Sequence, residues 1–255
     1  MIRIDRAAEP VALAAVRKDR LASARSAIAS GTKIDFTDYD IVKGDLAAMQ
    51  HNKCCYCEKR EEQPKYRDVE HYRPKSLYWW LAWTWENLLF ACIDCNREQK
   101  RSQFPQEPSS TPLVAEQAPP AGEKPLVIDP SDPSVEPTME ITFMRERIQG
   151  KERWVPRGTS ARGRKTVEVC GLDRPNLLDL YADHVSHAVR AKLGSFVTAD
   201  AEGNAQAAFK AWETARRGLL ARERPFRALS HDALNVLVPR ATRERYRLVL
   251  EAPSP

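Results

Sequence analysis

The sequence predicts an α+β protein in which a small metal-stapled unit lies between helical segments. Two Cys-x-x-Cys pairs, Cys54/Cys57 and Cys92/Cys95, enclose short apolar runs with strand character. Helical periodicity precedes these pairs and returns after residue 159. We therefore expect an N-terminal helical segment (1–50), a metal-bound core (51–105), a linker with short strands (106–158) and a C-terminal helical region (159–255).

The first helix is expected over residues 10–30, with Pro10 in its first turn and Gly31 as its stop signal. A second helix is expected over 39–49, with Ile41, Leu46 and Met49 facing inward. Neither helix carries obvious chemistry, so packing against the core is the expected role. The inward residues predicted for the first helix are Val11, Leu13, Ala14, Val16, Leu21, Ala24 and Ile28.

Beyond the core, residues 105–125 are rich in Pro, Ser and Glu, and this composition predicts a surface linker. Short strands are then expected at 126–129, 139–144 and 152–156, with a turn at Gly150. The helices expected after them cover 160–170, 176–197, 205–222 and 226–250, the last interrupted at Pro239.

The bulk composition indicates a cytoplasmic protein. The chain has 255 residues and a net charge of +5, which permits nucleic acid as a partner without demanding it. No apolar run reaches the roughly 20 residues needed to cross a bilayer, and the N-terminus lacks a signal peptide. In the cytoplasm cysteines stay reduced, so paired cysteines indicate metal rather than disulfides.

The two Cys-x-x-Cys pairs predict a structural zinc site. Each pair places two thiolates on one tight turn, and two pairs complete the tetrahedral Cys₄ set that Zn²⁺ prefers. Cys55 does not fit the pair spacing, although it could substitute for Cys54. Cys55 and Cys170 are interpreted as small packed hydrophobic residues.

The segment between the pairs has an informative order of elements. A strand-like run at 68–72 contains Glu70-His71, and Asn87 precedes a second short strand at 88–91. A helix is then expected to open at Cys92, with Asn96 directly after the second pair. This order of strand, loop, strand and helix resembles the ββα-metal fold of HNH endonucleases.

The resemblance implies a role for each of four residues. His71 would be the general base, and Glu70 beside it a metal ligand. Asn87 would hold the loop and orient the base, and Asn96 would be the second metal ligand. Glu at position 70 and Asn at position 96 depart from the more familiar Asp and His, which leaves an all-oxygen set. Oxygen ligands favour Mg²⁺ or Mn²⁺ as the catalytic metal.

Longer matching stretches narrow the resemblance. The runs at 69–75, 78–80 and 85–88, the Cys92-x-x-Cys95-Asn96-x-x-x-Lys100 motif, and Gly171-Leu172-Asp173-Arg174-Pro175 are similar to the PtuB family. PtuB is the HNH component of Septu and some retron anti-phage systems. The resemblance implies a nuclease that works with PtuA, an ATPase. The sequence shows no Walker-type loop, so a PtuA-like ATPase would be a separate chain.

Several further groups have a chemical and a purely structural interpretation. Four cations flank the motif and are expected to bind phosphates, with ordinary surface charge as the alternative. They are Arg73, Lys75, Arg97 and Lys100. Residues 145–165 hold eight basic and two acidic residues, and three interpretations are open: contact with a nucleic-acid backbone, a solvated loop, or a surface for an acidic partner. The aromatic residues at 78–85 are expected to cover the core of the metal-bound segment, with stacking on unpaired nucleic-acid bases as the alternative. His184 and His187 are three residues apart, but no third ligand is evident.

Three functions remain open from the sequence. The first is a metal-dependent HNH endonuclease acting on DNA or RNA in phage defence. The second is a non-catalytic zinc-stapled module that binds nucleic acid or a partner. The third is a stand-alone modification-dependent restriction endonuclease.

Overall fold

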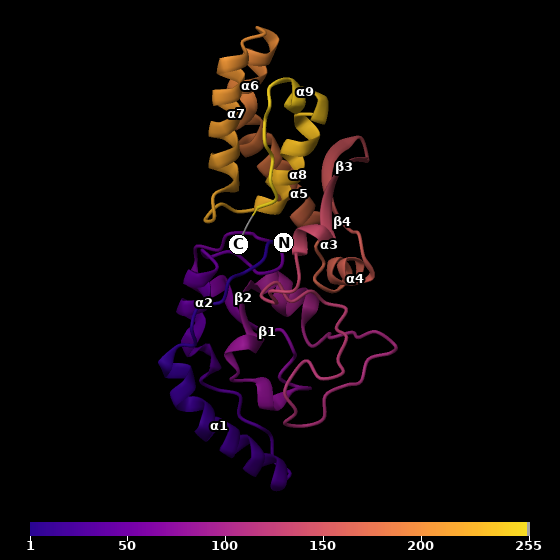
Figure 1. The fold of residues 1–255 in the computed structure, drawn as a ribbon. Helices are drawn as coiled ribbons and strands as arrows, with labels where there is room; N and C mark the ends of the chain where they lie inside the picture. The colour runs from indigo at the N-terminus through magenta and orange to yellow at the C-terminus, as the bar shows by residue number, and fades with distance from the viewer. Residues whose placement is uncertain (254–255) are drawn as a thin grey trace.

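Helices lie at both ends of the molecule and two small sheets lie between them (Figure 1). The fold comes from a computed structural model, which describes residues 1–253. Strands β1 (Arg67–His71) and β2 (Leu88–Cys92) form one antiparallel pair, and β3 (Ile141–Ile148) and β4 (Lys151–Gly158) form another. The α+β prediction is therefore confirmed.

The N-terminal helices form where they were expected. Helix α1 spans Val11–Ala29, and α2 spans Lys43–Met49 after a 3₁₀ turn at Tyr39–Val42. The inward face predicted for α1 is partly wrong. Leu13 and Ala24 are buried, whereas Val11 is 83% and Ile28 48% exposed. Val11 precedes Leu13 by two residues, which places it roughly 200° around the helix.

The second predicted helix needs a smaller correction. Leu46 is buried in α2 as expected. Ile41 is 43% exposed, and its neighbour Val42 takes the buried position instead. The reason is local, because the 3₁₀ turn changes which side chain faces the core just before α2 begins.

Strands β1 and β2 form the centre of the core segment. They pair in register, with Val69 opposite Phe90 and Glu70 opposite Leu89. After β2 the chain enters a π-helical segment, Asp94–Lys100, which carries Cys95. Every residue of β2 is buried, so this strand has packing partners on both of its faces.

The two faces of β2 belong to two different hydrophobic cores. Leu88 and Phe90 pack with the N-terminal helices, whereas Leu89 and Ala91 pack with the C-terminal region. This division follows from the two-residue period of a strand. Trp83 and Trp85, from the aromatic residues at 78–85, are buried in the core beneath the N-terminal helices. This agrees with the prediction that these aromatic residues cover a core.

The linker is less regular than predicted. Residues 126–129 do not form a strand, although Val127 and Ile128 are buried. The Ile128 amide donates to the Thr166 hydroxyl at 2.9 Å, and the Leu126 amide donates to the Pro105 carbonyl at 2.9 Å. A side chain and a loop carbonyl thus accept the hydrogen bonds of these backbone amides, which a neighbouring strand would otherwise accept. A short helix, α3 (Pro137–Glu140), then leads into β3.

The C-terminal region is helical, as predicted. Helix α5 (Pro175–His184), a π turn (Val185–Val189) and α6 (Arg190–Ala201) join into one continuous rod, and α7 (Ala205–Leu220) runs back beside α6 (Figure 1). Pro239 separates α8 from α9. Among residues 1–253, no helix combines the length and apolar character that crossing a bilayer requires. The remaining helices are α4 (Ala161–Val169), α8 (Arg227–Leu237) and α9 (Arg240–Arg245).

Candidate functional site

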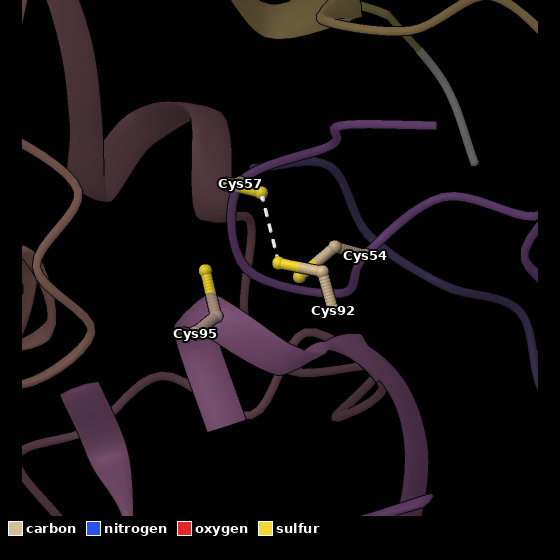
Figure 2. Close-up of side chains that lie close together, drawn as sticks. All are labelled: Cys54, Cys57, Cys92 and Cys95. Atoms are coloured by element: carbon tan, nitrogen blue, oxygen red, sulfur yellow. Dashed lines mark hydrogen bonds between the residues drawn. The ribbon is translucent and has the colours of Figure 1, made fainter. Parts of the chain in front are cut away.

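The four cysteines of the two pairs meet in one buried cluster (Figure 2). Their sulfur atoms all lie within 4.8 Å of one another, and the Sγ atoms of Cys57 and Cys92 are 3.8 Å apart. Zinc–sulfur bonds of about 2.3 Å in a tetrahedron separate the sulfurs by about 3.8 Å. The cluster can therefore hold a tetrahedral metal such as zinc. Cys55 and Cys170 are also buried but lie outside this ligand group.

A buried glutamine, Gln50, joins the first cysteine turn to β2. Its side-chain amide donates to the carbonyls of Lys53 and Phe90, and its oxygen accepts from the Phe90 amide at 2.8 Å. The Cys55 amide also donates to the Phe90 carbonyl at 2.9 Å. These contacts hold the first cysteine pair against the strand that ends in Cys92. Gln50 lies outside both cysteine motifs, and the sequence analysis missed it.

A second site lies beside β1, in a hollow of about 440 Å³. Glu70, His71 and Asn96 line this hollow, although Asn96 is 25 residues beyond His71 in the chain. Asn87 does not line the hollow and instead holds the loop between Arg73 and Leu81. The structure thus brings three of the four predicted residues to one surface and places the fourth in a supporting position.

His71 is held in a defined tautomer. Its Nε2 lies 3.0 Å from the carbonyl oxygen of Ala82, and a carbonyl can only accept, so Nε2 carries the proton. Nδ1 is then the unprotonated nitrogen, the one that can accept a proton. Burial lowers the pKa of His71 to about 3, and the nearby positive charge of Lys75 contributes to this shift. The imidazole is therefore neutral near pH 7.

Asn87 holds the loop that supplies the Ala82 carbonyl. Its side-chain oxygen accepts from the Arg73 amide at 2.8 Å. Its amide group donates to the carbonyls of Arg73 at 3.0 Å and Leu81 at 3.1 Å. Leu81 directly precedes Ala82, so Asn87 fixes both ends of the loop that orients His71. The side chain is 2% exposed, which makes each of these bonds costly to lose.

Glu70 sits in a buried ion pair. The ammonium of Lys100 lies 2.6 Å from its Oε1, and the Tyr56 hydroxyl donates to the same oxygen at 3.2 Å. Lys100 also donates to the His71 carbonyl at 3.1 Å. Burial raises the pKa of Glu70, and the Lys100 ammonium acts against that rise. The ion pair fixes the position of Glu70 between β1 and the π-helical segment.

Asn96 is oriented by Asp68, which lies two residues before Glu70 on β1. The Asn96 amide nitrogen donates to Asp68 at 3.3 Å, so the nitrogen end of the side chain faces Asp68. Arg97 makes two bonds to the same carboxylate, at 2.6 and 2.7 Å. Asp68 also lines the hollow and was missed in the sequence analysis. Strand periodicity was the available signal, because it places residues 68 and 70 on one face.

The four predicted phosphate-binding cations fall into two groups. Lys75 and Arg97 line the hollow, and Arg97 is 62% exposed in its ion pair with Asp68. Lys100 is fully buried against Glu70, and Arg73 pairs at 2.7 Å with Glu123, which is also fully buried. This placement differs from the expectation that all four flank a scissile phosphate. Both departures arise because carboxylates distant in sequence pack against these cations.

Three further residues at the hollow carry no sequence motif. The Tyr39 ring meets the His71 ring edge-on, with the centroids 4.6 Å apart, and the Tyr39 hydroxyl accepts from Lys75 at 2.7 Å. Lys43 and Arg101 also line the hollow and add positive charge to its rim. Tyr39 and Lys43 come from the N-terminal helical segment, so that segment contributes to the site as well as to packing.

His184 and His187 do not form a metal site. His184 Nε2 is 2.8 Å from the Ser230 hydroxyl, whereas His187 Nδ1 faces the Asp183 carbonyl. In the part of the chain that the structure describes, the four cysteines form the only group of three or more His, Cys, Asp or Glu ligands.

Comparison with known proteins identifies two curated relatives. A Septu protein PtuB from Bacillus mycoides (strain KBAB4) is 31% identical over 202 residues, which cover 70% of this chain and 65% of that protein. A Septu protein PtuB from Bacillus thuringiensis is 42% identical over 74 residues, which cover 29% of each chain. This chain therefore spans less than two thirds of either relative. No family model and no solved structure matches it. The resemblance expected from the sequence is confirmed as homology to these PtuB proteins.

Proposed function

We propose that this homologue of the Septu PtuB proteins is the nuclease component of an anti-phage defence system. The β1–β2–π-helix unit acts as a ββα-metal core of the HNH type. It hydrolyses phosphodiester bonds in nucleic acid, and a separate PtuA-like ATPase chain is its partner. The observation that carries this proposal is the imidazole of His71, whose Nε2 is held by the Ala82 carbonyl in the hollow that Glu70 and Asn96 also line.

Two metal sites belong to the proposal. Zinc in the Cys₄ cluster is structural, because four thiolates leave no open coordination position. Oxygens of Glu70 and Asn96 would hold Mg²⁺ or Mn²⁺, a donor set that fits hard cations. Such a cation would supply stabilisation of negative charge on the phosphate and on the leaving oxygen.

The residues of the chain carry the remaining steps. His71 accepts the proton of the attacking water at Nδ1, and its Nε2–H bond to Ala82 stabilises the imidazolium that forms. Lys75 and Arg97, on the rim of the hollow, bind the phosphates on either side of the scissile bond. Lys100 holds Glu70 in position and does not contact substrate.

The test is a cleavage assay with His71→Ala and a matched control, His187→Ala, which changes an exposed histidine outside the hollow. Each protein, checked for bound zinc, is incubated with plasmid DNA, single-stranded DNA and total RNA, with and without Mg²⁺ or Mn²⁺. We expect His71→Ala to lower the cleavage rate at least about 100-fold, and His187→Ala to leave it unchanged. The assay is repeated with the PtuA-like ATPase present.

The other outcomes separate the alternatives. Equal cleavage by wild type and His71→Ala would overturn the proposed site. Binding of nucleic acid without cleavage, even with the ATPase, would indicate a non-catalytic zinc module. Cleavage restricted to modified DNA, with no ATPase needed, would indicate a stand-alone restriction endonuclease.

A further inference from the structure

The turn between α4 and α5 packs directly on the π-helical segment. It contains Gly171 and Arg174 of the Gly-Leu-Asp-Arg-Pro motif, to which the proposed chemistry gives no role. Gly171 has a φ of +54°, and a Cβ atom there would lie 2.3 Å from the side chain of Gln99. The positive φ favours glycine at this position, and a side chain there would also have to displace the end of the Gln99 side chain.

Arg174 extends from this turn to the cysteine cluster. Its Nη1 donates to the Gly171 carbonyl at 2.9 Å and lies 3.6 Å from the sulfur of Cys95. Its Nη2 lies 3.6 Å from the carboxylate of Asp94, a residue inside the second Cys-x-x-Cys pair. The side chain is 11% exposed, so its charge sits largely out of water.

Lys59 pairs with the same carboxylate oxygen of Asp94. Its ammonium lies 3.5 Å from Asp94 and 3.2 Å from Glu61. Lys59 follows the first cysteine pair by two residues, and its carbonyl accepts from the Cys54 amide at 3.0 Å. Two cations, one from the core and one from the C-terminal region, thus meet at the edge of the cluster.

The charge of a loaded cluster gives these cations a role. Zinc with four thiolates carries a net charge of −2, and all four cysteines are at most 2% exposed. Burying uncompensated charge is costly unless opposite charges or hydrogen bonds lie close by. A cationic N–H donor on sulfur also withdraws electron density, which makes the thiolate less reactive toward electrophiles and protons.

We propose that Arg174 is a positioning residue of the zinc centre. It neutralises the thiolate charge and protects Cys95, while Lys59 acts more weakly through Asp94. The centre is thus shared between the core and the C-terminal region, and Arg174 controls how tightly zinc is retained. This inference rests on the proposed zinc occupancy of the cluster and not on nuclease activity.

The experiment measures zinc release from the full-length protein to the chromogenic chelator 4-(2-pyridylazo)resorcinol, with and without N-ethylmaleimide. The variants are Arg174→Gln, Arg174→Lys and a control, Arg190→Gln, which removes a half-exposed arginine paired with Glu152. We expect Arg174→Gln to release zinc about 10- to 100-fold faster than wild type. Arg174→Lys should recover part of the loss, and Arg190→Gln should match wild type.

A spectroscopic measurement separates this role from simple packing. In the Co²⁺-substituted protein, loss of the hydrogen bond to Cys95 makes the thiolates more electron-rich, so Arg174→Gln should shift the sulfur-to-cobalt band to longer wavelength. An unchanged band together with wild-type zinc release would overturn the proposal. Equal acceleration by Arg190→Gln would overturn it as well.

Two controls keep the test decisive. Wild type that binds no zinc would refute the zinc site itself, which is a different failure from zinc release that ignores Arg174. If Arg174→Gln does not fold, Lys59→Gln replaces it, because Lys59 lies nearer the surface. A faster release from Lys59→Gln than from Arg190→Gln would support the proposal, and equal release would contradict it.

Discussion

At the scale of single residues, a buried amide determines how the candidate base is presented. Asn87 donates to the carbonyls of Arg73 and Leu81, Ala82 follows Leu81, and the Ala82 carbonyl accepts a hydrogen bond from Nε2–H of His71. The motif reading of Asn87 as a loop-holding residue agrees with these contacts, and its effect on activity stays a prediction. The sequence could not show that Lys100 would pair with Glu70 or that Arg73 would pair with Glu123.

The first prediction concerns the stability that Asn87 supplies. Asn87→Ala removes three hydrogen bonds and leaves the part-buried backbone groups of Arg73 and the buried carbonyl of Leu81 without this partner. We expect the free energy of unfolding in urea to fall by about 3 kcal/mol. Asn235→Ala, at an exposed position of α8, should change it by less than about 0.5 kcal/mol. Similar losses in both variants would contradict the loop-holding role.

The second prediction concerns pH and His184. Burial lowers the pKa of His184 to about 4, although Glu58 acts against this shift. The unfolded chain binds the proton near pH 6.5, so stability is complete above pH 6.5 and declines as the pH falls toward 4. This residue should account for a loss of about 2–3 kcal/mol over that interval.

Unfolding curves of wild type and His184→Gln measured between pH 7.5 and 4 test the second prediction. The variant should lose less stability over this interval, because glutamine does not titrate. Parallel pH profiles for the two proteins would show that His184 does not contribute.

At the scale of elements, helix α1 shows where periodicity is a weak guide. Its position was predicted within one residue at each end, because Pro10 and Gly31 act locally on the backbone. Its inward face was predicted less well. Leu13 and Ala24 pack on the core, whereas Val11 faces solvent. How much of a helix is covered depends on the neighbouring elements, and the helix's own sequence does not contain that information.

The third prediction tests this orientation of α1. Leu13→Ala empties a fully buried position and should lower the free energy of unfolding by about 3 kcal/mol. Val11→Ala, two residues earlier in the same helix, should change it by less than about 0.5 kcal/mol. Urea unfolding followed by circular dichroism measures both. A larger effect of Val11→Ala would mean that this face is covered.

At the scale of the whole molecule, the cysteine cluster lies where the main parts of the chain meet. It belongs to the hydrophobic core that includes the C-terminal helices, and β2 connects that core to the one under α1 and α2. Arg174 reaches the cluster from the C-terminal region, 79 residues beyond Cys95. Loss of a metal here would therefore affect more than the local turn.

The fourth prediction is that zinc removal destabilises the whole fold. Structural zinc supplies on the order of 10 kcal/mol, comparable to the entire net stability of a domain. Cys54→Ala should lose zinc and melt far below wild type, whereas Cys55→Ala should retain zinc, because Cys55 lies outside the ligand group. Zinc content and thermal melting measure both effects. Zinc retained by Cys54→Ala would show that Cys55 can replace Cys54.

The sequence by itself determined the α+β class, most helices and strands near their observed bounds, the Cys₄ cluster and the relationship to PtuB, but the strand predicted at 126–129 does not form. The elements follow from short-range spacing, which local backbone geometry translates directly into structure. The Cys₄ cluster joins residues as far apart as Cys57 and Cys92, and it was predictable because zinc coordination by two Cys-x-x-Cys pairs is chemically specific. Only the tertiary structure decided that Asp68 orients Asn96, that Lys100 is buried against Glu70 and that Arg174 reaches Cys95. Each of these contacts joins residues 28 to 79 positions apart. Such contacts depend on how whole elements pack, and packing is set by the cores of the entire chain rather than by any local motif.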